Sequence, residues 1–152
     1  MPCKPDLAVL AQTVKRVFED AAFVFLSPAE SGVPPAATLM TARLAFAAVD
    51  ARGALSLTAT PGFANLLARN MLGLDDGAEI SESSRVDALG EAVNLVAGKV
   101  LREWLGAEAR YVLAAPVVGV GTPTSSGLGL AFASDEGETI TLTLAADGPS
   151  VG

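Results

Sequence analysis

The sequence predicts an α+β domain in which long α-helices pack on an antiparallel β-sheet. Apolar residues recur at helical spacing in three stretches, over about residues 6–22, 61–72 and 84–105. Elsewhere they alternate with small or polar residues, which is the period of a β-strand. Because the helical stretches are separated from the alternating ones, and neighbouring alternating stretches form hairpins, the order favours helices on an antiparallel sheet.

The first half of the chain is predicted to hold one helix and one hairpin. Residues 6–22 have the pattern of an amphipathic helix, with apolar positions from Leu7 to Ala21 expected in the core. A strand is predicted from Thr38 to Phe46, and its hairpin mate follows a turn at Arg52-Gly53. The segment between helix and strand is predicted to be a loop because it contains Pro28, Gly32, Pro34 and Pro35.

Two helices are predicted in the middle of the chain. The first opens at Pro61, continues to about Leu72 and ends at Gly73, followed by an acidic connector over residues 75–83. The second is the longest, because its apolar periodicity continues to Leu105, just before Gly106. Its predicted start is Ser84, which with Asp87 has the spacing of a capping box, although Asp replaces the usual Glu or Gln.

The last third of the chain is predicted to be extended. Residues 112–120 are apolar but contain Pro116 and Gly119, so they fit either a strand or a buried loop. Residues 128–132 and 139–144 alternate as strands, and residues 134–138 join them as a hairpin. With no linker or repeat, residues 1–152 are expected to form a single domain with loose termini at 1–4 and 147–152.

Composition excludes several classes of function. The 152 residues carry a net charge of −7, so nucleic acid and anionic membranes are poor partners. Histidine is absent and Cys3 is the only cysteine, which removes Ser-His-Asp and Cys-His catalysis and His- or thiolate-ligated metals. The sequence has neither a signal-peptide layout nor an apolar run near the ~18 residues of a membrane span. A cytoplasmic protein is therefore expected.

The longest predicted helix carries a polar stripe. Asp87, Glu91 and Asn94 stand at positions i, i+4 and i+7, so they share one face of a helix, and Gly98 lies on the same stripe. The opposite face is apolar and is expected in the core; it consists of Leu89, Val93, Val96, Val100 and Trp104.

Two interpretations of this stripe fit the spacing. It is a solvated helix face on which Asp87 only caps the helix start, or it is a face that docks a partner. Helix propensity favours the second, because Gly90, Asn94 and Gly98 together cost a helix about 2.5 kcal/mol relative to alanine. The missing side chain of Gly98 would let a partner backbone approach, whereas Gly90 lies to one side and suits internal packing.

The spacing Asp87-x3-Glu91-x2-Asn94 resembles the signature of the CheC/CheX/FliY group of chemotaxis phosphatases. The glycines at 90 and 98 are most similar to the CheX-type branch. Met71-Leu-Gly-Leu74 before the acidic connector and Leu113-x2-Pro116-x4-Gly121 after the helix also match. CheC-type members carry the signature on two helices, but the first helix here has no Glu-x2-Asn, so the resemblance implies one site per chain.

The resemblance implies a phosphatase that acts on phosphorylated CheY-type response regulators. Asn94 would orient the attacking water, since a carboxamide both accepts and donates hydrogen bonds. Glu91 would pair with a lysine of the receiver domain through a charge-assisted contact. This role is favoured over that of a general base, because an exposed glutamate is a weak base at neutral pH. Asp87 and Gly98 would support the site. The receiver would bring the divalent metal, so no cofactor or metal is expected in this chain.

Three further expectations accompany this prediction. One alternative is a non-catalytic receiver-binding or switch module like the middle domain of FliM. Another is a hot-dog-fold acyl thioesterase, which would require Glu91 to be deeply buried. The resemblance and the apolar strands, whose edges need covering, point to a homodimer, although the sequence leaves the oligomeric state open.

Overall fold

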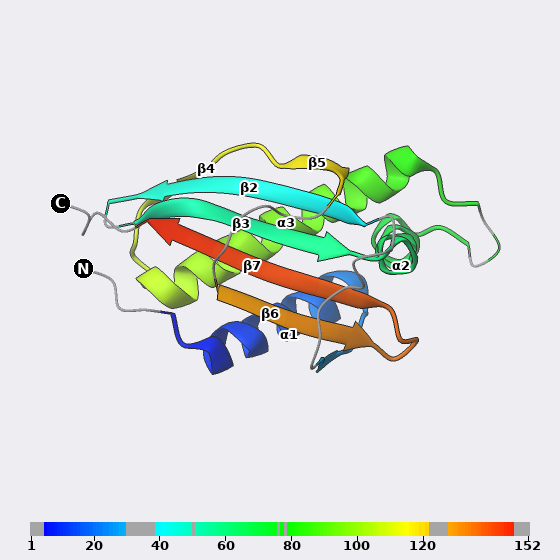
Figure 1. The fold of residues 1–152 in the computed structure, drawn as a ribbon, viewed down its shortest axis with the longest axis horizontal. Coiled ribbons are helices and arrows are strands. Elements are labelled where there is room, and N and C mark those ends of the chain that lie inside the picture. Colours follow the sequence, from blue (N-terminus) through cyan, green and yellow to red (C-terminus); the bar gives the residue numbers. More distant parts are fainter. Residues whose placement is uncertain are drawn as a thin grey trace.

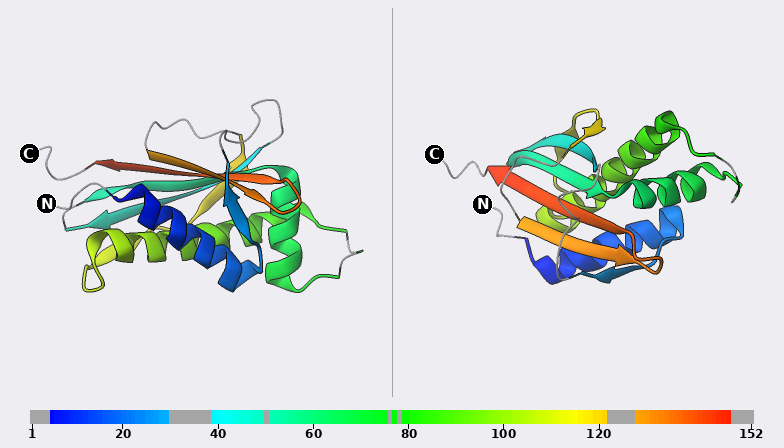
Figure 2. Two further views of the ribbon diagram at one scale, coloured as in Figure 1. Left: turned by 90° about the horizontal axis from the view of Figure 1, so that it is seen from below. Right: turned by 45° about the vertical axis from the view of Figure 1, so that its right-hand side comes forward.

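The computed structural model describes residues 5–29, 39–49, 51–75, 77, 79–121 and 128–147. In this part of the chain, three helices cover one face of a seven-stranded sheet, as the two-layer arrangement in Figures 1 and 2 shows. The predicted α+β class, with helices on an antiparallel sheet, is confirmed.

All strand pairs in the sheet are antiparallel. The strand order is β1-β6-β7-β3-β2-β4, and β5 pairs with the same edge of β2 as β4 does. Both predicted hairpins, β2–β3 and β6–β7, are confirmed. The strands are β1 (Leu26–Pro28), β2 (Met40–Ala48), β3 (Arg52–Ala59), β4 (Tyr111–Leu113), β5 (Val117–Val120), β6 (Leu128–Ser134) and β7 (Thr139–Asp147).

The first two helices lie close to their predicted positions. Helix α1 (Leu7–Ala22) begins after Asp6, whose Oδ1 accepts a hydrogen bond of 2.9 Å from the Ala8 N–H. Helix α2 (Pro61–Leu72) has the predicted bounds and ends at Gly73, which adopts a left-handed conformation. Its first turn is capped by the Thr60 side chain.

The predicted start of the longest helix is wrong by two residues. Helix α3 (Glu82–Leu105) begins at Glu82, and Ser81 rather than Ser84 is the cap. The Ser84 N–H donates to Ser81 Oγ at 3.1 Å, so the acceptor of the capping hydrogen bond is the Ser81 side chain and not that of Ser84. The proposed capping box of Ser84 and Asp87 is therefore not formed, and Asp87 is the sixth residue of the helix. The predicted end at Leu105 is correct.

Three other local predictions need correction. Pro28 lies in the short edge strand β1, where a missing N–H is tolerated. Arg52 and Gly53 pair with β2 in the ladder, and the turn lies earlier, closed by a 2.7 Å hydrogen bond from Ala48 N–H to Ala51 O. Residue 147, predicted to lie in a loose terminus, ends β7. Of the two alternatives for residues 112–120, the strand is confirmed for the parts that belong to β4 and β5.

Some predictions concern residues outside the described ranges. They are the loop residues Gly32, Pro34 and Pro35, the N-terminal residues 1–4 with Cys3, and residues 148–152 of the C-terminal tail.

The core lies between α3 and the sheet. Four residues of the predicted apolar face of α3 are fully buried, namely Leu89, Val93, Val96 and Val100. Trp104 is half-buried and its ring meets Phe46 of β2 edge-on, with 6.2 Å between centroids. Helix α3 also packs against α1 and α2, which fixes its position across the sheet. In α1 the predicted core face is confirmed at Leu10, Val14, Val17 and Phe18. Leu7 is exposed and Ala21 is only half-buried, and Ala22 is the buried alanine at this end of the helix.

Candidate functional site

The predicted stripe lies on the outer face of α3. Asp87, Glu91 and Asn94 are exposed, and Gly98 is half-buried. Since all four belong to one continuous helix at spacings of three and four residues, the structure brings them to the same face, away from the sheet. The stripe is therefore accessible to another macromolecule.

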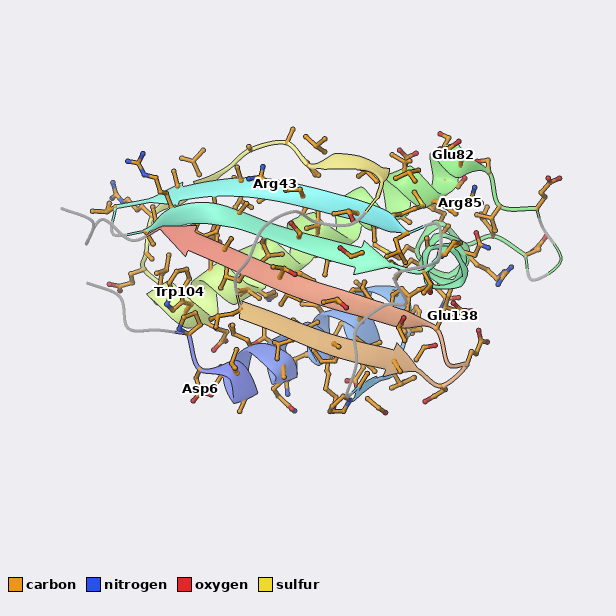
Figure 3. The ribbon with its side chains drawn as sticks, in the orientation of Figure 1. Asp6, Arg43, Glu82, Arg85, Trp104 and Glu138 are labelled. Atoms are coloured by element: carbon orange, nitrogen blue, oxygen red, sulfur yellow. The ribbon has the colours of Figure 1, made fainter. Side chains whose placement is uncertain are left out.

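Helix α3 holds this stripe in a rigid position. Its 24 residues give a length of about 36 Å, and it is capped by Ser81 at one end and Gly106 at the other. Figure 3 places Glu82 near the first end and Trp104 near the second, so the stripe lies well inside the helix. Because fraying is confined to helix ends and the opposite face is buried, the stripe side chains project from a fixed backbone.

The two glycines of the stripe region have different surroundings. A Cβ at Gly90 would lie 3.6 Å from Val118 Cγ2 and 3.9 Å from Pro116 Cβ, so this glycine faces β5 and serves internal packing, as predicted. A Cβ at Gly98 would meet no described atom within 4 Å beyond the backbone of α3 itself. The Gly98 carbonyl accepts a 3.3 Å hydrogen bond from Tyr111 Oη. Gly98 thus leaves open space beside Asn94.

The polar groups of the stripe are free to bind a partner. Within the described part of the chain, no hydrogen bond or ion pair engages the side chains of Glu91 and Asn94. Among the same residues, no group of three or more Asp, Glu, His or Cys side chains is placed to hold a metal ion. No helix there combines the length and the apolar character needed to span a membrane.

The exposure of Glu91 does not fit the thioesterase alternative. That alternative needs a central helix enclosed by the sheet, with its carboxylate buried. Here α3 lies in an open layer with α1 and α2, and Glu91 points to solvent. The geometry instead suits a site that is completed by a second protein.

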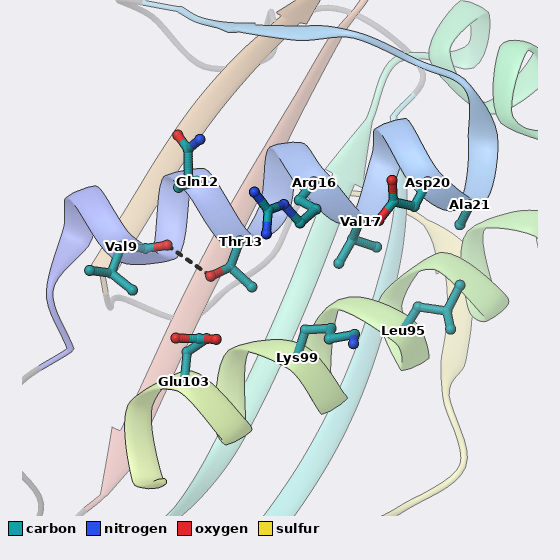
Figure 4. Close-up of a pocket in the computed structure, with 10 residues that line it drawn as sticks. All are labelled: Val9, Gln12, Thr13, Arg16, Val17, Asp20, Ala21, Leu95, Lys99 and Glu103. Atoms are coloured by element: carbon teal, nitrogen blue, oxygen red, sulfur yellow. Dashed lines mark hydrogen bonds between the residues drawn. The ribbon is translucent and has the colours of Figure 1, made fainter. Parts of the chain in front are cut away.

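One feature beside the stripe was not predicted. A groove of about 620 Å³ runs between α1 and α3 on the outer side of the helix layer, as Figure 4 shows. Leu95 and Lys99 of α3 line it, and each directly follows a stripe residue in the chain. Sequence spacing gave no signal for it, because the groove exists only where two helices far apart in the sequence lie side by side.

Comparison with solved structures finds close similarity of fold. CheX from Vibrio vulnificus superimposes with a TM-score of 0.69 at 23% identity, covering 91% of this chain and 93% of that one. CheX from Desulfovibrio desulfuricans gives 0.64 at 20% identity, covering 90% and 96%. CheX from Borrelia burgdorferi, solved in a complex with CheY, BeF3 and Mg²⁺, gives 0.68 at 12% identity, covering 92% and 96%.

The chain therefore has the fold of the CheC/CheX/FliY group of chemotaxis proteins. The resemblance predicted from the stripe is confirmed at the level of the fold, and CheX proteins are among its structural neighbours over nearly their whole length. No protein-family model and no curated protein sequence matches the chain.

Proposed function

We propose that this protein binds a phosphorylated CheY-type receiver domain and accelerates hydrolysis of its aspartyl phosphate. The observation that carries the proposal is the exposed, unpartnered pair Glu91 and Asn94 in the middle of α3. The fold is shared with a CheX that has been solved in a complex with CheY. The output would be a chemotaxis-type or other two-component response.

Asn94 is assigned the role of orienting water. An aspartyl phosphate is a reactive mixed anhydride, so its hydrolysis needs mainly a water molecule held in line with the bond that breaks. Water attacks phosphorus, the bond between phosphorus and the aspartyl oxygen breaks, and phosphate and a free aspartate result. The Asn94 amide accepts a hydrogen bond from the water and donates one to a neighbouring oxygen. Its helix position fixes the direction of approach.

Glu91 is assigned the role of anchoring the partner. It lies one turn before Asn94, so both side chains enter the same region of a docked receiver. A carboxylate that meets a receiver lysine forms a charge-assisted hydrogen bond, which fixes the register of Asn94 over the phosphoryl group. The divalent metal of the reaction belongs to the receiver.

Gly98 and Asp87 are assigned supporting roles. The open space over Gly98 admits the partner's backbone close to α3. Asp87 is one turn before Glu91 and exposed, so it contributes charge at the margin of the docking surface. Its earlier assignment as a cap is excluded by the position of Ser81.

The test is phosphate release from a panel of CheY-type receivers, phosphorylated with a small-molecule phosphodonor, with and without this protein. The wild type is expected to accelerate release, and Asn94→Ala to lower that acceleration by about 100-fold. Alanine is the better helix former, so Asn94→Ala is expected to be no less stable. An Asn94→Ala variant as fast as the wild type would exclude the mechanism.

A receiver-binding module without catalysis is the second candidate. The FliM middle domain of H. pylori also shares the fold, with a TM-score of 0.55 at 12% identity, covering 90% of this chain and 84% of that one. The same panel separates the two candidates. A receiver that binds to this protein but keeps its phosphate for its unassisted lifetime would favour the binding module.

A further inference from the structure

The groove between α1 and α3 has the chemistry of a contact surface. Its base is apolar, formed in part by Val17, Ala21 and Leu95, and its walls carry charges. Arg16 and Asp20 project from α1, while Lys99 and Glu103 project from α3 (Figure 4). The only hydrogen bond drawn among the lining residues joins Thr13 Oγ1 to Val9 O, at 2.8 Å. The four charged side chains are therefore available to a partner.

The groove adjoins the candidate site. Leu95 follows Asn94 and Lys99 follows Gly98, and one residue turns a helix by about 100°, so the groove lies along one flank of the stripe. Packed helices lie about 8–10 Å apart. A globular partner centred over Asn94 thus extends over α1 or over the strands on the other flank.

A docked receiver needs more contact area than the stripe offers. Stable protein–protein interfaces bury about 800 Å² on each partner, with an apolar centre that receives anchoring side chains. Glu91 and Asn94 contribute only two exposed polar side chains to such an interface and no apolar centre. The groove supplies the missing apolar surface, where Leu95 is 36% exposed and Val9 is 42% exposed.

The charges of the groove are balanced, so they do not repel an anionic partner. The whole chain carries −7, which repels acidic proteins at a distance. In the groove, Arg16 and Lys99 balance Asp20 and Glu103, so this flank is locally neutral. A receiver whose active site holds a phosphoryl group and metal-binding carboxylates meets less repulsion here than elsewhere.

We infer that the α1–α3 groove is the second half of the receiver-docking surface and selects which receiver is accepted. An apolar side chain of the receiver enters over Leu95 and Ala21, with Arg16 and Lys99 facing acidic groups around it. The inference rests on the proposed function, but it adds the groove to Glu91 as a source of binding affinity and leaves the orientation of the attacking water to Asn94.

The experiment measures binding separately from hydrolysis. The receiver used is one from the panel whose phosphate release the wild type accelerates. Each variant is titrated against this receiver after treatment with beryllofluoride and Mg²⁺, and phosphate release is followed at several receiver concentrations. The variants are a charge reversal, Arg16→Glu with Lys99→Glu, and a groove-filling change, Thr13→Trp. The matched control is Arg43→Glu, since Arg43 is exposed on β2 between residues whose side chains face the helices.

Both groove variants are expected to weaken binding at least tenfold while the maximal rate of phosphate release stays within twofold. Arg43→Glu is expected to bind within twofold of the wild type. Thermal unfolding checks that each variant is folded, and Arg16→Gln with Lys99→Gln gives an intermediate loss if charge is the cause. Either groove variant behaving like Arg43→Glu would overturn the inference. Wild-type protein that binds no receiver would instead overturn the proposed function.

Discussion

The two faces of α3 differ in what their side chains contact. On the face toward the sheet, Leu89 and Val93 are fully buried and contribute to the core. On the outer face, Glu91 and Asn94 are exposed, and their side chains form no hydrogen bond or ion pair within the part of the chain that the structure describes. Neighbouring residues of one helix therefore have different roles. The buried residues stabilise the fold, and the exposed ones are proposed to contact a partner. Substitutions on the two faces are expected to separate stability from activity.

The largest expected effect is on the buried face. Leu89→Ala should lower the free energy of unfolding by about 3 kcal/mol, because it removes apolar contacts and leaves a cavity. The measurement is urea unfolding followed by circular dichroism. Leu95→Ala is the matched control, since Leu95 is partly exposed and its loss should cost less than about 1 kcal/mol. Equal losses would show that the two faces do not differ in this way.

A smaller effect is expected at the anchoring carboxylate. Glu91→Ala should raise the receiver concentration needed for half-maximal phosphate release about tenfold, or about 1.4 kcal/mol, through loss of a charge-assisted contact. The maximal rate should change much less than in Asn94→Ala. Initial rates over a range of receiver concentrations separate the two constants. Glu82→Ala, at the exposed start of the same helix, should leave both unchanged.

The glycines offer a finer comparison. Gly98→Ala should raise the free energy of unfolding by up to about 1 kcal/mol, because alanine favours the helix and its Cβ enters open space. The same change should weaken receiver binding if a partner backbone approaches there. Gly90→Ala is the control: its Cβ makes ordinary contacts with β5, so binding should not change. Denaturant unfolding and receiver-binding titrations on both variants measure the change in stability and the change in affinity. Unaltered binding by Gly98→Ala would remove Gly98 from the docking surface.

The smallest effect is expected at Asp87. Because Asp87 is exposed and lies beyond the capped first turn, Asp87→Ala should change stability by no more than about 0.5 kcal/mol. Phosphate release should stay within twofold of the wild type. A loss comparable to that of Glu91→Ala would assign Asp87 a direct contact with the receiver.

Much of the fold could be predicted where the local signals are strong. Helix α2 has the predicted bounds because Pro61 and Gly73 act through their own backbone preferences, whatever the tertiary context. The start of α3 was misplaced because residues 82–85 carry no apolar signal, so periodicity alone could not choose between Ser81 and Ser84. Strand β1 was missed since it has three residues and contains Pro28, which only an edge strand tolerates.

The candidate site divides in the same way. Glu91, Asn94 and Gly98 could be predicted to share a face because helix geometry relates them directly. The groove could not be predicted from the sequence. Its lining residues, such as Arg16 and Lys99, are distant in the sequence and come together only when α1 packs beside α3. The sequence thus indicates features within one element, and the structure is needed for those between elements.

The position of the stripe inside a helix also has an evolutionary consequence. Point substitutions on the outer face of α3 cost little folding free energy. The specificity for a partner can therefore change through substitution of exposed side chains without loss of the fold. Insertion of a single residue between Leu89 and Glu91 would instead turn the remainder of the helix by about 100° relative to the sheet. Val93 would leave the core and polar groups would enter it. Lineages of this protein are therefore expected to keep the length of α3 unchanged, while its exposed residues other than Glu91 and Asn94 vary.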